Sequence, residues 1–226
     1  MNYAIPFLRE RFENLVAKLE KYKNASLVPQ SSYLRIDQKL ENGVGTYEFD
    51  PLLNNGGASP LEKKLDKNDL FFINSIGVFL TAKNIALPAD VVMLSTVNPA
   101  ELKASISEAG LTNLKTDLAA ATGLNTIYNG FISLRTGQEV TLQNLPMWMF
   151  NRISDDNAGV EGSSVILPER VQLNGSSDQR FTLSFNGAGT TMQNATTPKY
   201  EFGVSLFLTG FLVKGGARIV EVTPGS

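Results

Sequence analysis

One short stretch carries enough oxygen ligands for metal chemistry. It contains Asp155, Asp156, Asn157 and, four residues later, Glu161. Ca²⁺ prefers carboxylate and amide oxygens, and this stretch offers several within seven residues. Its spacing differs from that of the EF-hand loop, which alternates its ligands and ends on a bidentate glutamate at position twelve. A calcium-binding loop and a solvated loop without metal are the two alternatives, and we expect no bound metal.

Carboxylate pairs are the second kind of chemistry open to this chain. Two carboxylates that face one cleft can cleave a glycosidic bond. Carboxylates beside strands more often pair with arginine at a surface, and no spacing in this sequence places two of them in one cleft. The acidic residues in or beside predicted strands are Glu48, Asp50, Glu139, Glu169 and Glu201.

The 226 residues include no cysteine and no histidine. Disulfides, thiolate zinc sites, iron–sulfur clusters and cysteine nucleophiles are therefore excluded. A Ser-His-Asp triad, imidazole metal ligands and the usual base with a pKa near neutrality are excluded as well. We expect a protein that is not an enzyme and that binds no cofactor.

The charge balance is close to neutral, with 20 basic and 22 acidic residues and a net charge of −2. Charged residues make up 19% of the chain, below the roughly 25% of an average soluble domain. Copies of such a chain repel one another weakly, which favours self-association. The same balance argues against direct binding of nucleic acid. No apolar run is long enough for a signal peptide or a transmembrane helix.

The N-terminal residues predict an amphipathic helix over residues 5–23. Its charged residues, Arg9 and Arg11 among them, fall on the opposite face from its apolar ones. The helix can pack on its own domain, dock on a neighbouring subunit, or lie on a membrane surface; the second alternative makes Ile5, Leu8, Phe12, Leu15 and Leu19 interface residues. The apolar residues that recur three or four apart are Ile5, Leu8, Phe12, Leu15, Val16, Leu19 and Tyr22.

The rest of the chain is dominated by predicted strands. Runs rich in aromatic and β-branched residues predict strands over 33–40, 46–49, 69–82, 126–135, 180–185, 200–213 and 217–222. Asn98 and Pro99 begin a short helical insertion near residues 98–122, with a further helical turn at 114–121. We therefore divide the chain into an N-terminal helix or arm, residues 1–26, and one β-domain, residues 27–226.

The only tryptophan, Trp148, lies in the apolar run from Leu142 to Phe150. Such a run is usually part of a core. Because Trp, Met and Phe are enriched at the centres of protein interfaces, a subunit contact through Trp148 is the alternative.

The turns support an antiparallel arrangement of these strands. Asn-Gly occurs five times, and this dipeptide supplies the positive φ values of tight hairpin turns. Asn129-Gly130 falls inside a predicted strand, so a bulge is expected there. Helices and strands do not alternate along the chain. The predicted fold is mainly β, an antiparallel β-sandwich of the jelly-roll type with an N-terminal helix and a short helical insertion.

Residues 160–222 resemble the closing strands of capsid-type jelly-roll proteins of tailless bacteriophages. The segment 167–173 leads through the turn 174–178 to the strand 180–185, and the long strand 200–213, with Gly210 inside it, ends at Lys214-Gly215-Gly216. The resemblance implies a virion protein that self-assembles into a shell or vertex with copies of itself and other virion proteins. The basic arm of many RNA-packaging capsid proteins is missing. The alternative functions are a carbohydrate-binding or adhesion β-sandwich and a carboxylate glycosidase.

Overall fold

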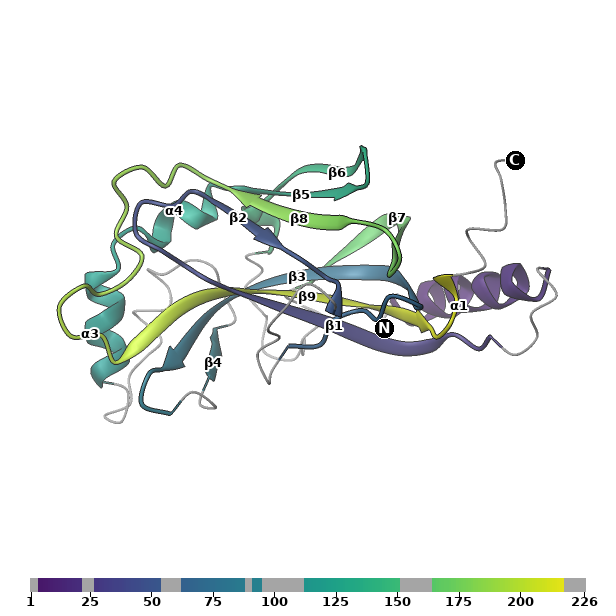
Figure 1. The fold of residues 1–226 in the computed structure, drawn as a ribbon, viewed down its shortest axis with the longest axis horizontal. Helices are drawn as coiled ribbons and strands as arrows, with labels where there is room; N and C mark the ends of the chain where they lie inside the picture. Colours follow the sequence, from purple (N-terminus) through teal and green to yellow (C-terminus); the bar gives the residue numbers. More distant parts are fainter. Residues whose placement is uncertain are drawn as a thin grey trace.

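The strands form two antiparallel sheets that lie face to face (Figure 1). The structure, a computed structural model, describes residues 4–21, 27–53, 62–87, 91–94, 112–150 and 164–217. Sheet A contains β1 (Gln30–Lys39), β9 (Tyr200–Val213), β3 (Leu70–Asn84) and β4 (Val91–Leu94) in that order, and β7 (Ser164–Asn174) pairs with β3 beside β4. Sheet B contains β2 (Thr46–Phe49), β8 (Gln179–Ser184), β5 (Phe131–Thr136) and β6 (Glu139–Pro146) in that order. The predicted antiparallel β-sandwich is confirmed.

The strand pairing is nested. β1 pairs with β9, β2 with β8, β3 with β7, and β5 with its immediate successor β6. The pairings of β9 with β3 and of β8 with β5 join these pairs into two sheets. The chain therefore follows a long two-stranded ribbon whose tip is the β5–β6 hairpin. Successive pairs of the ribbon fall alternately in sheet A and sheet B.

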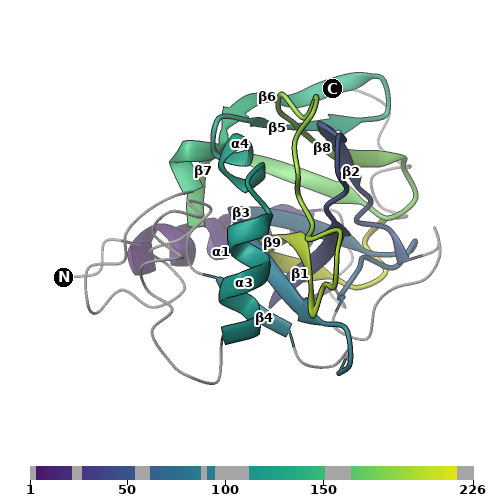
Figure 2. The same ribbon diagram turned by 90° about the vertical axis from the view of Figure 1, so that its left-hand side faces the viewer.

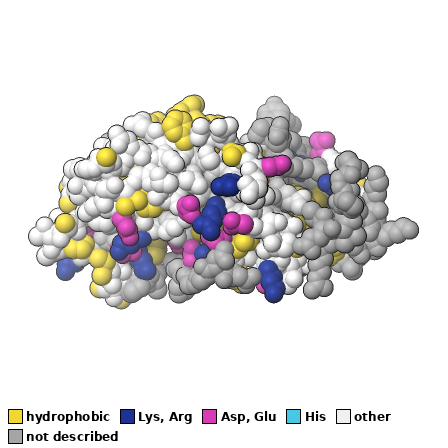
Figure 3. All heavy atoms as spheres, turned by 45° about the horizontal axis from the view of Figure 1, so that its top comes forward, with side chains coloured by type: hydrophobic (Ala, Val, Ile, Leu, Met, Phe, Trp, Pro, Cys, Tyr) yellow, Lys and Arg dark blue, Asp and Glu magenta, His cyan; other side chains and the backbone are white. Residues whose placement is uncertain are grey.

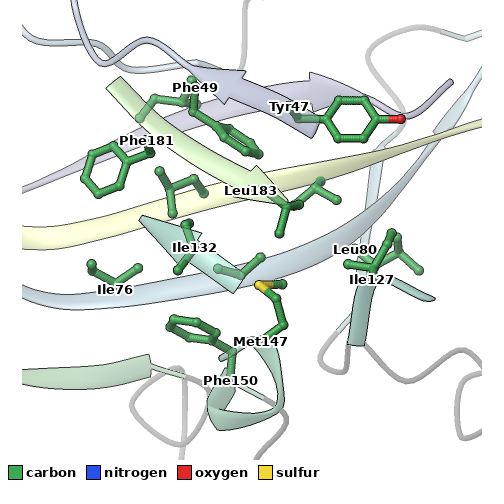
Figure 4. Packing of buried hydrophobic residues seen from close by; sticks show 14 of the residues in the cluster. Tyr47, Phe49, Ile76, Leu80, Ile127, Ile132, Met147, Phe150, Phe181 and Leu183 are labelled. Atoms are coloured by element: carbon green, nitrogen blue, oxygen red, sulfur yellow. The ribbon is translucent and has the colours of Figure 1, made fainter. Parts of the chain in front are cut away.

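Alternate side chains of the strands fill the space between the sheets. Figure 4 shows this packing, with Phe49, Phe181 and Ile132 of sheet B pointing toward sheet A. β3 is buried along almost its whole length, since it lies between two neighbouring strands and both of its faces are covered. Its sequence is therefore a nearly continuous apolar run rather than an alternating one. The buried residues of sheet A that face sheet B include Leu34, Ile36, Phe71, Ile73, Ile76, Val78, Leu80, Phe202, Val204, Leu206 and Leu208.

Helices lie at the two ends of the sandwich. The long helix α1 (Ala4–Lys21) is at one end, and α3 (Thr112–Ala120) and α4 (Leu124–Tyr128) are at the other (Figures 1 and 2). A 3₁₀ helix, η3 (Met147–Phe150), follows β6 directly, and its Met147 and Phe150 point between the sheets (Figure 4). The predicted N-terminal helix is thus present, and the helical turn expected near 114–121 is α3.

One predicted strand is partly wrong. The first three residues of the expected strand 126–135 belong to α4, and β5 begins only at Phe131. Leu124 and Ile127 are both buried, at the three-residue spacing of a helical turn, and the carbonyl of Gly123 accepts the N–H and the hydroxyl of Thr126. Asn129-Gly130 is consequently the connection between α4 and β5 and not a bulge inside a strand.

A β-bulge interrupts the central pairing of sheet A. Ile73 pairs with Gly210 and Ser75 with Thr209, so Asn74 is one extra residue in β3. At the same level β7 leaves its register with β3 between Val171 and Ile166. The irregularities of β3 and β7 therefore lie at the same level of the sheet, whereas β9 runs through it without an extra residue.

Candidate interaction surfaces

Helix α1 packs on the outer face of sheet A, opposite to sheet B. Leu15 and Leu19, four residues apart and therefore on one face of the helix, are buried against Leu70, Phe211 and Val213. The Phe12 ring meets the Phe211 ring edge to face, with 5.4 Å between the ring centres. This cluster is separate from the core between the sheets. The sandwich core is complete without the helix.

Arg11 departs from the expectation that it lies on the polar face of this helix. It is buried, and its Nη2 donates a hydrogen bond to the carbonyl oxygen of Leu167 in β7. Leu167 falls in the interval where β7 loses its register with β3, which is why its carbonyl can accept from the helix. The prediction for Arg11 was wrong because helical periodicity cannot foresee a carbonyl that a strand irregularity turns outward.

A groove of about 520 Å³ lies between α1 and the outer face of sheet A. Leu8 and Phe12 line it from the helix, and Thr209 and Gly210 from β9. Two of the predicted interface residues thus remain partly open, whereas Leu15 and Leu19 are buried within their own chain. The side chain of Ile5 lies outside the described residues. Contact of Leu8 and Phe12 with a neighbouring subunit stays a prediction.

Replacing Leu15 with alanine should release α1 from the sheet while the sandwich stays folded. Loss of one of the two buried leucines removes roughly 3 kcal/mol of docking free energy. We expect hydrogen exchange to accelerate at the amides of residues 8–19 and to stay slow in β9. Lys18→Ala, on the exposed side of the same helix, is the matched control and should leave both rates unchanged. Equal protection of the helix in the two variants would contradict the packing described above.

Trp148 is a surface residue. Its side chain is 59% exposed, whereas its neighbours Met147 and Phe150 are buried between the sheets. The expectation that the run 142–150 is core therefore holds for Met147 and Phe150 and is wrong for Trp148. Side chains three residues apart in a 3₁₀ turn lie on the same side, so Met147 and Phe150 both point inward while Trp148 points outward. Phe131 and Val140, on the same hairpin unit, are also exposed, at 46% and 57%.

Two of the carboxylates considered for catalysis, Glu48 and Glu201, lie on different sheets. Glu48 lies on the outer face of sheet B, 2.6 Å from Nη1 of Arg180, and Glu201 lies on the outer face of sheet A beside Nζ of Lys39. These two carboxylates therefore do not share a cleft. The hydrogen bond to Glu48, together with the nearby charge of Asp178, raises the pKa of Arg180 above its ordinary value.

The metal candidates Asp155, Asp156, Asn157 and Glu161 lie outside the described residues. Within the described ranges no group of three or more acidic side chains is arranged to hold a metal ion. The helices of the same ranges include none that is both long enough and apolar enough to cross a membrane.

A buried carboxylate holds the loop between β8 and β9. Asp117 of α3 is 1% exposed and accepts three hydrogen bonds. Its Oδ1 accepts from Nδ2 of Asn194 at 2.7 Å, and its Oδ2 accepts from the backbone N–H groups of Lys199 and Tyr200 at 2.8 Å each. Sequence reasoning missed this residue because a single aspartate in a short helix carries no pattern of its own.

The same loop is held at two further points. Gln193 donates from Nε2 to the carbonyls of Leu40 and Phe202 and accepts from the N–H of Phe202. The side-chain oxygen of Asn42 accepts from the N–H groups of Met192 and Gln193. This loop is therefore fixed to the β1–β2 connection, to β9 and to α3.

Tyr47 of β2 closes the neighbouring loop between β1 and β2. Its hydroxyl accepts from the N–H of Glu41 at 2.8 Å and lies 3.1 Å from the carbonyl oxygen of the same residue. Burial raises the pKa of Tyr47 above its ordinary value. The neutral phenol is therefore the form that the fold favours.

Acidic and basic side chains are mixed on one face of the molecule. On the face turned to the viewer in Figure 3 they lie side by side, with hydrophobic side chains at the upper edge and on the left. No family model, curated protein or solved structure matches this chain.

Proposed function

We propose that this chain is a virion structural protein that self-assembles into a capsid shell or vertex through contacts between subunits, without catalysis. Its partners would be further copies of itself and other virion proteins, and its location the virion. The proposal includes no direct contact with nucleic acid.

The nested strand pairing is the observation that carries this proposal. A ribbon of four strand pairs whose successive pairs alternate between two facing sheets is the arrangement of a jelly roll. We therefore assign the sandwich to that type, with β4 as an addition at the end of β3. Jelly rolls are frequent in viral capsids because a rigid block with many loops at its edges can meet several neighbours.

Two surface features support the same proposal. The helix α1 is attached outside a core that is complete without it, as expected of an element that can also contact a neighbour. The mixed surface charge lets copies approach without strong repulsion.

Size-exclusion chromatography with light scattering, followed by negative-stain electron microscopy, tests the proposal. We expect shells, rings or other closed oligomers at micromolar concentration. A monomer at every concentration up to about 1 mM, where only contacts weaker than roughly 4 kcal/mol escape detection, would overturn it.

Replacing Trp148 with glutamate should weaken assembly without unfolding the subunit. Exposed substitutions away from structural contacts change stability by about 0.5 kcal/mol or less, whereas a charge in the centre of an apolar contact costs several times that. We expect at least a tenfold rise in the concentration needed for assembly, measured by light scattering. In the wild type, the emission of this single tryptophan should shift to shorter wavelength on assembly.

Leu87→Glu is the matched control for this variant, because Leu87 is 62% exposed on the β3–β4 turn. It should assemble like the wild type. Normal assembly of the Trp148→Glu variant would remove Trp148 from the interface.

A carbohydrate-binding module is the second candidate function, and one observation favours it. Tyr33, Phe207 and Phe79 form a row of aromatic rings across three strands on the outer face of sheet A. Phe207 stacks on Tyr33 with 5.1 Å between ring centres, and Nζ of Lys63 lies 4.4 Å from the centre of the Tyr33 ring. Tyr33 is the most exposed ring of the row, and both contacts cover its faces, which a sugar would have to stack on. We therefore rank this function second.

A further inference from the structure

A small hollow lies on the outer face of sheet A, around Gly203 of β9. Gly203 is flanked by Lys39 on β1 and by Thr81 on β3, since both pair with it in the sheet. All three positions face away from sheet B, because Phe202 and Val204 on either side of the glycine are core residues. Gly203 has no side chain, so its backbone forms the floor of the hollow between the side chains of Lys39 and Thr81.

The hollow measures about 150 Å³. That is well below the roughly 300–1,000 Å³ of sites for drug-sized ligands, so its occupant is one small unit and not a chain. Its lining includes charged and hydroxyl side chains, together with the apolar Val91 and Phe202. The charged and hydroxyl residues are Asp37, Lys39, Thr81, Lys83 and Glu201.

The charges in this hollow do not cancel. Asp37 is compensated by Nε of Arg35 at 2.9 Å and also accepts a hydrogen bond from the Ser205 hydroxyl. Glu201 forms an ion pair with Lys39, and it is also the cross-strand partner of Lys83 in the register of β3 and β9. Among the residues that the structure describes, Lys83 has no ion pair of its own. Two ammonium groups therefore share one carboxylate, which leaves one positive charge.

We propose that this hollow binds a small hydroxylated carboxylate, of the size and chemistry of a single sugar acid. The ammonium of Lys83 receives the carboxylate of the ligand. The hydroxyl of Thr81 and the free lone pairs of Glu201 and Asp37 take the ligand hydroxyls, since carboxylates and hydroxyls on the protein side accept from them. The site is separate from the aromatic row around Tyr33 and does not depend on self-assembly.

Saturation-transfer NMR and equilibrium dialysis test this site on the full chain, whether it is assembled or not. Three probes are compared. Glucuronate carries hydroxyls and a carboxylate, glucose carries hydroxyls only, and acetate carries a carboxylate only. We expect glucuronate to bind at millimolar concentration and at least tenfold more tightly than either of the others. Lys83→Met should weaken glucuronate binding at least tenfold, and Thr81→Val should weaken it a few-fold.

Lys115→Met, an exposed lysine on α3, is the matched control and should bind as the wild type does. Thermal melts of all variants establish that they are folded. Absence of glucuronate binding, equal binding of acetate, or equal binding by Lys83→Met would each overturn the proposal. If Lys83→Met instead changes only the oligomeric state, the hollow is a contact for the carboxylate of a second copy and the proposal is likewise wrong.

Discussion

Replacing Gly210 with alanine is expected to cost about 4 kcal/mol of folding stability, a large share of what a domain possesses. A Cβ at this position would lie 1.9 Å from the carbonyl oxygen of Phe72 and 2.9 Å from its carbonyl carbon. Both atoms belong to the backbone of β3, so no side-chain rotation can relieve the contact. Relief would require the bulge at Asn74 to open, within the longest pairing of sheet A.

Guanidinium denaturation followed by circular dichroism measures this effect. Gly137→Ala is the matched control, because Gly137 has a φ of 58° and no heavy atom within 4 Å of its added Cβ. Its cost comes from the left-handed backbone alone and should be about 1 kcal/mol. A loss at Gly210 no larger than that at Gly137 would show that the sheet absorbs the methyl group. If Gly210→Ala does not fold at all, the soluble yield of the two variants makes the same comparison.

The second large effect is expected at Asp117. Asparagine has the same shape, but its amide turns one of the two acceptor oxygens into a donor. The N–H groups of Lys199 and Tyr200, or the amide of Asn194, would then face a donor at a site that is 1% exposed. Loss of charge-assisted hydrogen bonds at a buried site costs about 3 kcal/mol.

Denaturation curves of the Asp117→Asn variant should show this loss together with faster hydrogen exchange at Lys199 and Tyr200. Asp178→Asn is the control, since the Asp178 side chain is 70% exposed and accepts from Nε of Arg180 at the long distance of 3.5 Å. That variant should change stability by less than about 0.5 kcal/mol. Similar losses in the two variants would mean that Asp117 does not hold the β8–β9 loop.

The fold could be predicted from the sequence where a single strand has a recognisable hydrophobic pattern. The range of β9 was predicted to the residue, and that of β3 within two residues, because both strands are central and read as long apolar runs. β6 was missed, since its mostly exposed side chains leave no periodic pattern. α4 was missed because five residues are too few to separate a helical spacing from a strand.

The candidate surfaces were predictable only in part. The apolar spacing of α1 identified Leu15 and Leu19 as contact residues, but their partner is their own sheet. The hollow at Gly203 could not be foreseen, because it depends on the register of β1, β9 and β3, which are far apart in the chain. The exposure of Trp148 likewise depends on a turn that sequence hydrophobicity does not encode.

The nested pairing also dictates the order in which the molecule can form. The β5–β6 hairpin is the only pair of the ribbon that needs no long loop to close, whereas pairing of Leu34 with Leu208 must bring together residues from opposite regions of the chain. Long loop closure slows folding, and sandwiches of this kind fold in milliseconds to seconds. During synthesis, β1 and β3 wait with unpaired edges until β9 has left the ribosome, and unpaired edges promote aggregation. A subunit is therefore complete only after β9 has paired with β1 and β3.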